Sequence, residues 1–141
     1  MSIVDLEAIP QVTLPFMNDD HREEARLLND LGEAVHGHGK GKVPVETVLH
    51  CFEALLAHTQ EHFGREEEAM RQAAFPPYPV HKGEHDRVVD EMESEETHFR
   101  ETGDTGRLWS YVSEGIPAWF VPHIQSMDAI TAQFVVARRG S

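Results

Sequence analysis

Cysteine, long apolar runs and a secretion signal are all scarce or missing in this chain of 141 residues. Its only cysteine, Cys51, excludes an internal disulfide and fits a reducing compartment. No apolar run approaches the roughly 20 residues that cross a bilayer. The N-terminus, MSIVDLEAIPQ, lacks the basic start and apolar core of a secretory signal. We therefore expect a cytoplasmic protein that does not enter the membrane.

Basic residues are also few. Twelve Lys and Arg stand against 25 Asp and Glu, which gives a net charge of -13. Nucleic acids and anionic membrane surfaces repel such a protein, so we expect neither as a partner. The length suits one domain with one modest core, and we expect residues 1–141 to form it. Ten histidines are the compositional oddity, and they raise the question of a metal.

No segment alternates with the period of two residues that is typical of a strand, whereas four segments follow the period of a helix. These helices are expected at about 18–36, 44–73, 79–100 and 106–136, separated by the short runs GHGKGK, FPPYP and ETGDTG. Residues 1–17 contain two prolines and predict an extended arm. The pattern predicts an all-α protein, an up-down-up-down four-helix bundle with an extended N-terminal arm.

Two residues within these helices carry local predictions. Asn18 is expected to cap the first helix. Pro122 lies inside the last helix, where it removes a backbone hydrogen bond and predicts a bend.

Polar residues fall on the apolar faces of all four predicted helices. These residues are His21, His62, Glu66, His81, His85 and His123. Left without partners in a core, each would cost about 1–3 kcal/mol, which a domain stabilised by about 5–15 kcal/mol could not absorb. A metal would satisfy them together, because it accepts imidazole lone pairs and neutralises carboxylates.

The number of histidines favours two ions over one. Five imidazoles exceed the four ligands of a structural zinc site. Two ions that share carboxylates would use all the polar residues, and Glu66, one turn after His62, is placed to bridge them. Asp128 follows His123 by five residues, which an α-helix turns by about 140°. Spacing alone therefore puts Asp128 at the edge of the stripe and leaves its role open.

Three stretches resemble the hemerythrin family. HFGREEEAM, from His62, resembles its HFxxEExxM motif, HKGEH from His81 its HxxxH, and HIQSMD from His123 its HIxxxD. His21 stands where the family has its first ligand. The resemblance is to bacterial hemerythrin-like proteins and runs from about residue 14 to residue 135. It implies a four-helix bundle that holds a non-haem di-iron centre.

The resemblance also implies how the ligands divide. The residues His81, His85 and His123 would bind one iron, and His21 and His62 the other. Glu66 and Asp128 would bridge the two irons together with an oxo or hydroxo group. The second iron then keeps an open position, where dioxygen binds in the family. We therefore expect reversible dioxygen binding for storage, delivery or sensing rather than enzymatic activity.

Two other functions remain open from the sequence. One is a di-iron enzyme that reduces peroxide, nitric oxide or dioxygen, in which His58 could supply a proton. The other is a metal-binding or iron-storage module, and the same ligands accept zinc or manganese. We expect His58 beside the ligands rather than among them, and Trp119 and Val121 in the wall of the oxygen pocket. No signalling segment is evident, so delivery or sensing would need a separate oxygen-using enzyme or signalling partner.

Overall fold

The computed structural model describes residues 2–139, and within this range it contains helices and no strand. Three long α-helices come first: α1 (Pro15–Gly39), α2 (Val45–Gln72) and α3 (Tyr78–Thr102). The fourth rod is built from five consecutive segments: α4 (Thr105–Ser110), η2 (Tyr111–Gly115), α5 (Ile116–His123), η3 (Ile124–Asp128) and α6 (Ala129–Arg139). A short 3-10 helix, η1 (Leu6–Ala8), lies in the N-terminal arm. The expected all-α class is confirmed.

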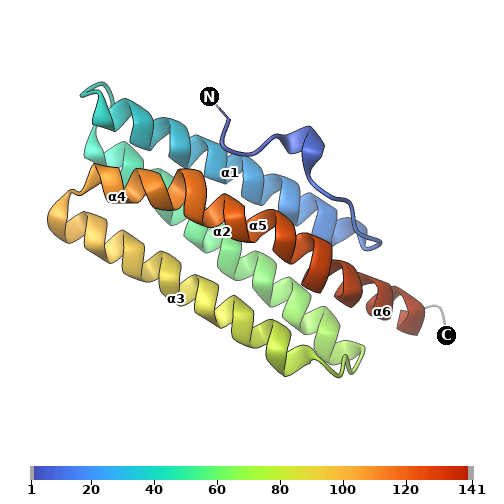
Figure 1. Ribbon diagram of the computed structural model, residues 1–141. Helices are drawn as coiled ribbons and strands as arrows, with labels where there is room; N and C mark the ends of the chain where they lie inside the picture. The colour runs from blue at the N-terminus through green and yellow to red at the C-terminus, as the bar shows by residue number, and fades with distance from the viewer. Residues whose placement is uncertain (1, 140–141) are drawn as a thin grey trace.

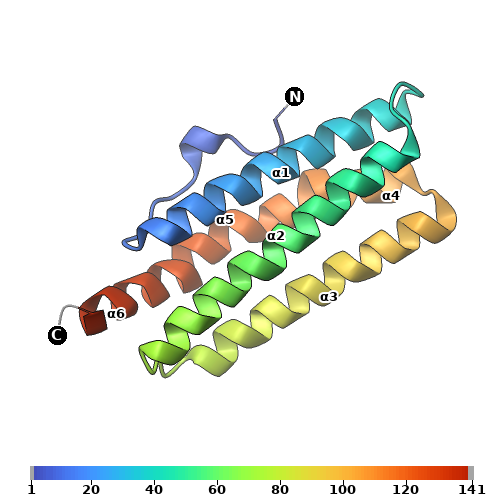
Figure 2. The same ribbon diagram turned by 180° about the vertical axis from the view of Figure 1, so that it is seen from behind.

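The four rods lie side by side, and the chain reverses direction at each loop (Figures 1 and 2). α1 packs against α2 and α4, and α2 packs against α3. This is the predicted up-down-up-down bundle. Its short loops leave neighbouring helices antiparallel, so each can contribute side chains to one shared interior.

The apolar core is divided into two clusters along the bundle. The larger one contains Leu28, Phe52 and Phe120, and the smaller one, near the C-terminal end, contains Met17 and Ala132. On α1, α2 and the fourth rod the buried polar positions fall between residues of the two clusters, and on α3 they precede the residues of the larger one. The bundle therefore buries its polar side chains in a layer that has apolar packing on both sides.

The arm is attached to α1 by two asparagines. Asn18 bonds the backbone N–H and C=O of Val12, at 2.8 and 2.9 Å, instead of capping the helix. Asn29 does the same with the N–H and C=O of Val4, at 2.8 and 2.9 Å. Asn18 thus lies inside α1, which begins at Pro15 rather than at the predicted residue 18. Proline suits the first turn of a helix.

α1 also continues to Gly39, three residues past the predicted end at residue 36. Its last turn is held by the following loop, since the Lys42 N–H donates to the Gly37 carbonyl at 2.9 Å. The His38 Nδ1 lies 2.8 Å from the Val43 carbonyl, which holds the loop against the helix. These contacts offset the weak helix propensity of the glycine-rich run.

The fourth rod stays helical through Pro122, and its departures from α geometry are two π segments, η2 and η3. In η2 the Ile116 N–H donates to the Tyr111 carbonyl, and in η3 the Ala129 N–H donates to the Ile124 carbonyl, each five residues back. A π segment widens the helix by one residue per turn and is frequent at functional sites. Pro122 lies inside α5 and does not end the helix, and the bend expected there stays a prediction.

Candidate metal centre

All seven residues proposed as ligands lie in the bundle interior and are buried. Their exposed fractions run from 0% for His21 and Glu66 to 6% for His123. They come from every rod: α1, α2, α3, α5 and η3. The full set is His21, His62, Glu66, His81, His85, His123 and Asp128. The fold therefore brings together what the sequence spreads over more than a hundred residues.

Glu66 lies between two groups of histidines. Its Oε2 is 2.7 Å from the His62 Nε2 and 3.5 Å from the His21 Nε2. Its Oε1 is 3.2 Å from the His85 Nε2 and 3.7 Å from the His81 Nε2. One carboxylate oxygen therefore faces each group.

Asp128 repeats this arrangement from the opposite rod. Its Oδ2 is 2.9 Å from the His21 Nε2. Its Oδ1 is 3.1 Å from the His81 Nε2 and 3.2 Å from the His123 Nε2. The two carboxylates thus stand between the same two sets of imidazoles.

The position of Asp128 depends on the π segment η3. In an α-helix five residues turn about 140°, which would carry Asp128 away from His123. The five-residue hydrogen bond of η3 returns it to the same face, where it meets His123. Spacing read with α geometry alone could not place this residue.

The donor atoms of these side chains are suited to cations. One set of five, Glu66, His81, His85, His123 and Asp128, offers atoms that all lie within 4.8 Å of one another, and His21, His62 and Glu66 form a second such set. Buried atoms in this cluster lack hydrogen-bond partners among the described residues, namely both ring nitrogens of His21, Nε2 of His85 and His123, and Oε1 of Glu66. Unsatisfied buried imidazole nitrogens and carboxylate oxygens in one place fit a pair of metal ions.

The charges in the cluster compensate one another. The pKa of Glu66 lies well below its ordinary value: burial would raise it, but the charge on His62 and the surrounding imidazole hydrogen bonds lower it more. The pKa of Asp128 is lowered as well: burial and the nearby Glu66 would raise it, but the three imidazoles that lie against its carboxylate lower it more. The carboxylates are therefore held ionised, the form in which they bind metal.

The imidazoles show the opposite shifts. Burial would lower the pKa of His62, but the Glu66 and Glu24 carboxylates raise it well above its ordinary value. The pKa of His21 is raised too, since Asp128 and Glu66 outweigh its burial. Protons and metal ions would therefore compete for the same nitrogens.

Three of the histidines have a partner at the nitrogen that faces away from the centre. The His62 Nδ1 lies 3.4 Å from Glu24 Oε1. The other two are His85, whose Nδ1 lies 2.9 Å from Glu67 Oε2, and His81, whose Nδ1 lies 2.8 Å from Thr131 Oγ1. Such partners orient the imidazoles that bind metals and increase their basicity.

Sequence reasoning missed Glu24 and Thr131. The signal was present, because each stands three residues after a proposed ligand, His21 or Asp128, and so shares its helical face. Glu24 is only 5% exposed, and the Thr59 hydroxyl donates to its Oε2 at 2.5 Å. A carboxylate buried this deeply has a role in the interior.

The structure places the His58 ring next to that of His62, with centroids 5.8 Å apart, and its role stays a prediction. Its Nε2 is 3.0 Å from the carbonyl oxygen of Asp20 and 3.6 Å from Glu24 Oε1. A carbonyl can only accept, so this nitrogen carries the proton and donates to Asp20. His58 thus links α2 to the backbone of α1.

Trp119 covers one ligand rather than standing apart from it. Its ring stacks on His123, with centroids 4.4 Å apart, and its Nε1 donates to Glu84 Oε1 at 2.8 Å. Val121 is half-buried and packs against the larger core cluster. Their place in the wall of an oxygen pocket stays a prediction.

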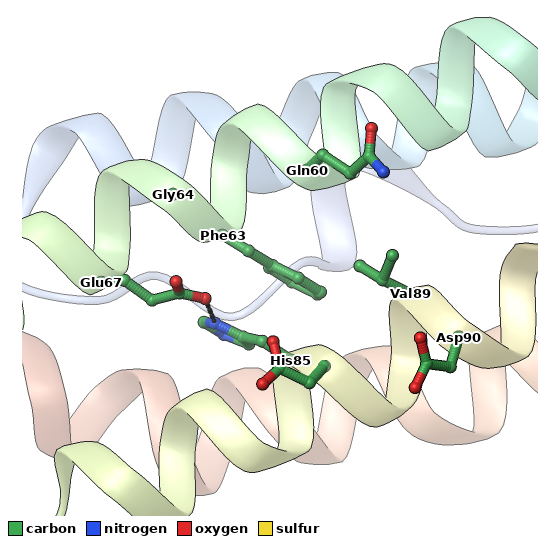
Figure 3. Close-up of a pocket in the computed structure, with 8 residues that line it drawn as sticks. Gln60, Phe63, Gly64, Glu67, His85, Val89 and Asp90 are labelled. Atoms are coloured by element: carbon green, nitrogen blue, oxygen red, sulfur yellow. Dashed lines mark hydrogen bonds and ion pairs between the residues drawn. The ribbon is translucent and has the colours of Figure 1, made fainter.

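A surface groove of about 430 Å³ between α2 and α3 reaches the centre at His85 (Figure 3). The Phe63 ring stacks on His85, with centroids 3.8 Å apart and planes inclined by 3°. Glu67, one turn after Phe63 on α2, reaches the same imidazole, and its Oε2 lies 2.9 Å from the His85 Nδ1 (Figure 3). Phe63, Glu67 and His85 all line this groove, so it lies directly beside one proposed ligand.

Fold and site together define a helical-bundle protein with a buried histidine and carboxylate centre for two cations. The sequence pattern of the Hemerythrin HHE cation binding domain matches residues 12–135. The chain belongs to this family, the hemerythrins, and is a non-haem di-iron, oxygen-binding protein.

Two bacteriohemerythrins are similar to it. That of Aquifex aeolicus (strain VF5) is 31% identical over 118 residues, which cover 84% of this chain and 86% of the relative. That of Ralstonia nicotianae (strain ATCC BAA-1114 / GMI1000) is 34% identical over 88 residues, which cover 62% of this chain and 63% of the relative. Within residues 2–139, no helix has the length and apolar character that crossing a membrane requires.

Proposed function

We propose that this centre holds two iron ions and binds dioxygen reversibly, for storage, delivery or sensing. The observation that carries the proposal is the double-sided placement of Glu66 and Asp128, each with one oxygen toward either set of histidines. Two carboxylates placed in this way would be shared by two ions. A single ion would leave the other half of the cluster unsatisfied.

The ligands divide as the geometry suggests. One ion would be held by His81, His85 and His123, and the other by His21 and His62. Glu66 and Asp128 would bridge them, with an oxo or hydroxo group between the ions. The second ion would have fewer protein ligands, so dioxygen would bind on the side of His21 and His62. When bound, the iron pair would supply the redox chemistry of reversible dioxygen binding.

The protein's own contribution is burial, orientation and control of protons. The seven ligands are at most 6% exposed, so bulk water is excluded from the centre. Glu24, Glu67 and Thr131 fix the rings of His62, His85 and His81.

The position of His58 favours a binding protein over an enzyme. Its Nε2 proton is committed to the Asp20 carbonyl and does not point at the proposed ions. Without a proton donor at this place, further reduction of bound dioxygen is slower, which favours its release. We therefore place this chain with the oxygen binders, although an unidentified oxygen-using enzyme or signalling partner would complete delivery or sensing.

The proposal includes the bounds of the domain and the compartment in which it works. We propose that residues 1–141 form one hemerythrin domain. The single Cys51 thiol fits a reducing compartment such as the cytoplasm.

Metal analysis and optical spectroscopy test the function. We expect two irons per chain and a visible absorption band that appears when the reduced protein meets oxygen, fades when oxygen is removed and returns on re-exposure. Catalytic consumption of peroxide or nitric oxide without a reversible cycle would establish the enzyme instead. Metal uptake without any oxygen response would indicate a storage module.

A further inference from the structure

His21 is supported differently from three of the histidines around it. The outer nitrogens of His62, His81 and His85 each have a side-chain partner. The Nε2 of His21 faces the Asp128 and Glu66 carboxylates, but its Nδ1 has no hydrogen-bond partner among residues 2–139. It is also the one proposed ligand that α1 contributes. The outer side of this ring therefore depends on the helix that carries it.

Asp20, the residue directly before His21, is bound by two residues of α2. Arg65 donates to both carboxylate oxygens of Asp20, from Nε at 2.8 Å and from Nη2 at 2.6 Å. His58 donates from Nε2 to the backbone carbonyl of the same residue at 3.0 Å. Side chain and main chain of Asp20 are both fixed, at a point adjacent to the ligand.

His58 and Arg65 both lie close to His62 in the sequence of α2, and His62 is the other proposed ligand of the same ion. His58 precedes it by one helical turn and Arg65 follows it by three residues. The contacts with Asp20 therefore set the separation of α1 and α2 at the level of His21 and His62. A bidentate pair between Arg and a carboxylate fixes direction as well as distance.

We propose that Asp20, Arg65 and His58 form a positioning clamp for His21, in place of the partner that its Nδ1 lacks. The inference rests on the proposed two-ion centre. The Arg65 side chain is 44% exposed and that of Asp20 is 12% exposed, so this ion pair adds little to overall stability. Its effect is geometric, and it falls on the ion bound by His21 and His62.

The chain offers a matched control. Arg100 of α3 and Glu53 of α2 also form an ion pair between two helices, but they lie beside the larger apolar cluster and touch none of the proposed ligands. Replacing Arg100 removes a comparable bond between helices without changing anything near His21. A general loosening of the bundle would appear in this variant as well.

The experiment withdraws metal from the loaded protein. The cobalt(II)-loaded chain is mixed with excess chelator, and loss of the cobalt absorption bands is followed in time. Two phases are expected for the wild type, the faster one from the ion with fewer protein ligands, that of His21 and His62. The variants are Asp20→Asn, Arg65→Met, His58→Phe and the control Arg100→Met.

In Asp20→Asn and Arg65→Met the fast phase should accelerate by about tenfold, the low end of what outer partners of metal ligands contribute. The slow phase should match the wild type. The double variant should be no faster than the single ones, because both changes remove the same contact. His58→Phe removes the bond to the Asp20 carbonyl and the contact with Glu24 but keeps the Arg65–Asp20 pair. It should accelerate the same phase, which keeps the test valid if an Asp20 variant folds poorly.

Two results would overturn the clamp. One is an unchanged fast phase in all three variants. The other is equal acceleration of both phases, with Arg100→Met behaving in the same way, which would mean that the contacts only hold helices together. A wild type that binds fewer than two ions would instead refute the proposed centre, and the clamp with it.

Discussion

The His123 Nε2 and the Asp128 Oδ1 lie 3.2 Å apart, although five residues separate them on one continuous helical rod. The π segment η3 makes this contact possible by adding one residue to a turn. The carboxylate that completes the centre is therefore placed by an irregular backbone, and its replacement is the most direct test of the centre.

Asp128→Asn should reduce the iron content from two ions per chain to one or fewer. The change removes the negative charge shared by the two proposed ions and leaves an amide, which is a poor ligand. Iron analysis after anaerobic reconstitution measures the effect. Asp86→Asn changes an exposed carboxylate and should keep both ions; two irons in Asp128→Asn would rule out a bridging role.

Glu24→Gln should weaken metal binding by about 10- to 100-fold, because the His62 ring loses its charged outer partner. The amide keeps the shape of the side chain, so packing is preserved. A competition titration with a chromophoric chelator gives the affinity. Glu23→Gln is the matched control, since that neighbouring carboxylate is half-exposed and bonds Arg26.

Removal of the metal should lower the melting temperature markedly, because ions that bind only the folded chain stabilise it by mass action. α1 should loosen first, since it contributes only His21 to the centre. Differential scanning calorimetry and amide hydrogen exchange of the loaded and chelated protein report the two effects. Equal melting temperatures would show that the buried imidazoles and carboxylates pair with one another without metal.

Glu96→Gln should stabilise the protein at pH 7 by up to about 1 kcal/mol, because it removes a charge from a buried carboxylate oxygen that has no hydrogen-bond partner. The Glu96 Oε2 is buried without a hydrogen-bond partner, and Arg100 Nη2 is 3.7 Å away. Burial raises the pKa of Glu96 above its ordinary value of 4.5. The folded chain therefore holds this proton more tightly than the unfolded chain.

The sign of the pH effect follows from that difference. The destabilisation by Glu96 is absent well below the ordinary pKa and complete above the raised one, so the contribution of this group to stability falls as the pH rises through this window. Urea denaturation at pH 4 and pH 7 should show a gap between wild type and Glu96→Gln that is wider at pH 7. Glu93→Gln, at an exposed position, should show neither gap nor trend.

Much of this architecture could be predicted from periodicity. The apolar stripes predicted four helices, and the polar residues on them predicted which side chains meet inside, because a stripe defines a face. Asp128 could not be placed in this way, since α spacing does not anticipate a π segment. Glu24 and Thr131 were missed because a polar residue on a helix edge is usually solvated.

The two ends of α1 could not be predicted from the residues next to them either. Asn18 looks like a helix cap, yet its amide serves the arm, a contact six residues away that depends on how the arm folds back. His58 and Arg65 meet Asp20 across 38 and 45 residues. Such pairs are set by how two helices pack, which sequence spacing on either one does not contain.

The two asparagines that hold the arm also determine which contacts would bear a force applied to the N-terminus. Asn29 and Asn18 anchor the arm at Val4 and Val12, and Ile3 lies so close to Gly32 that even a methyl group there would collide with it. Tension applied at the first residues would thus be borne by Asn29, one helical turn or more beyond His21, before it reached Asn18. A tag or surface tether attached at that end should leave the oxygen response unaltered until the outer anchor gives way.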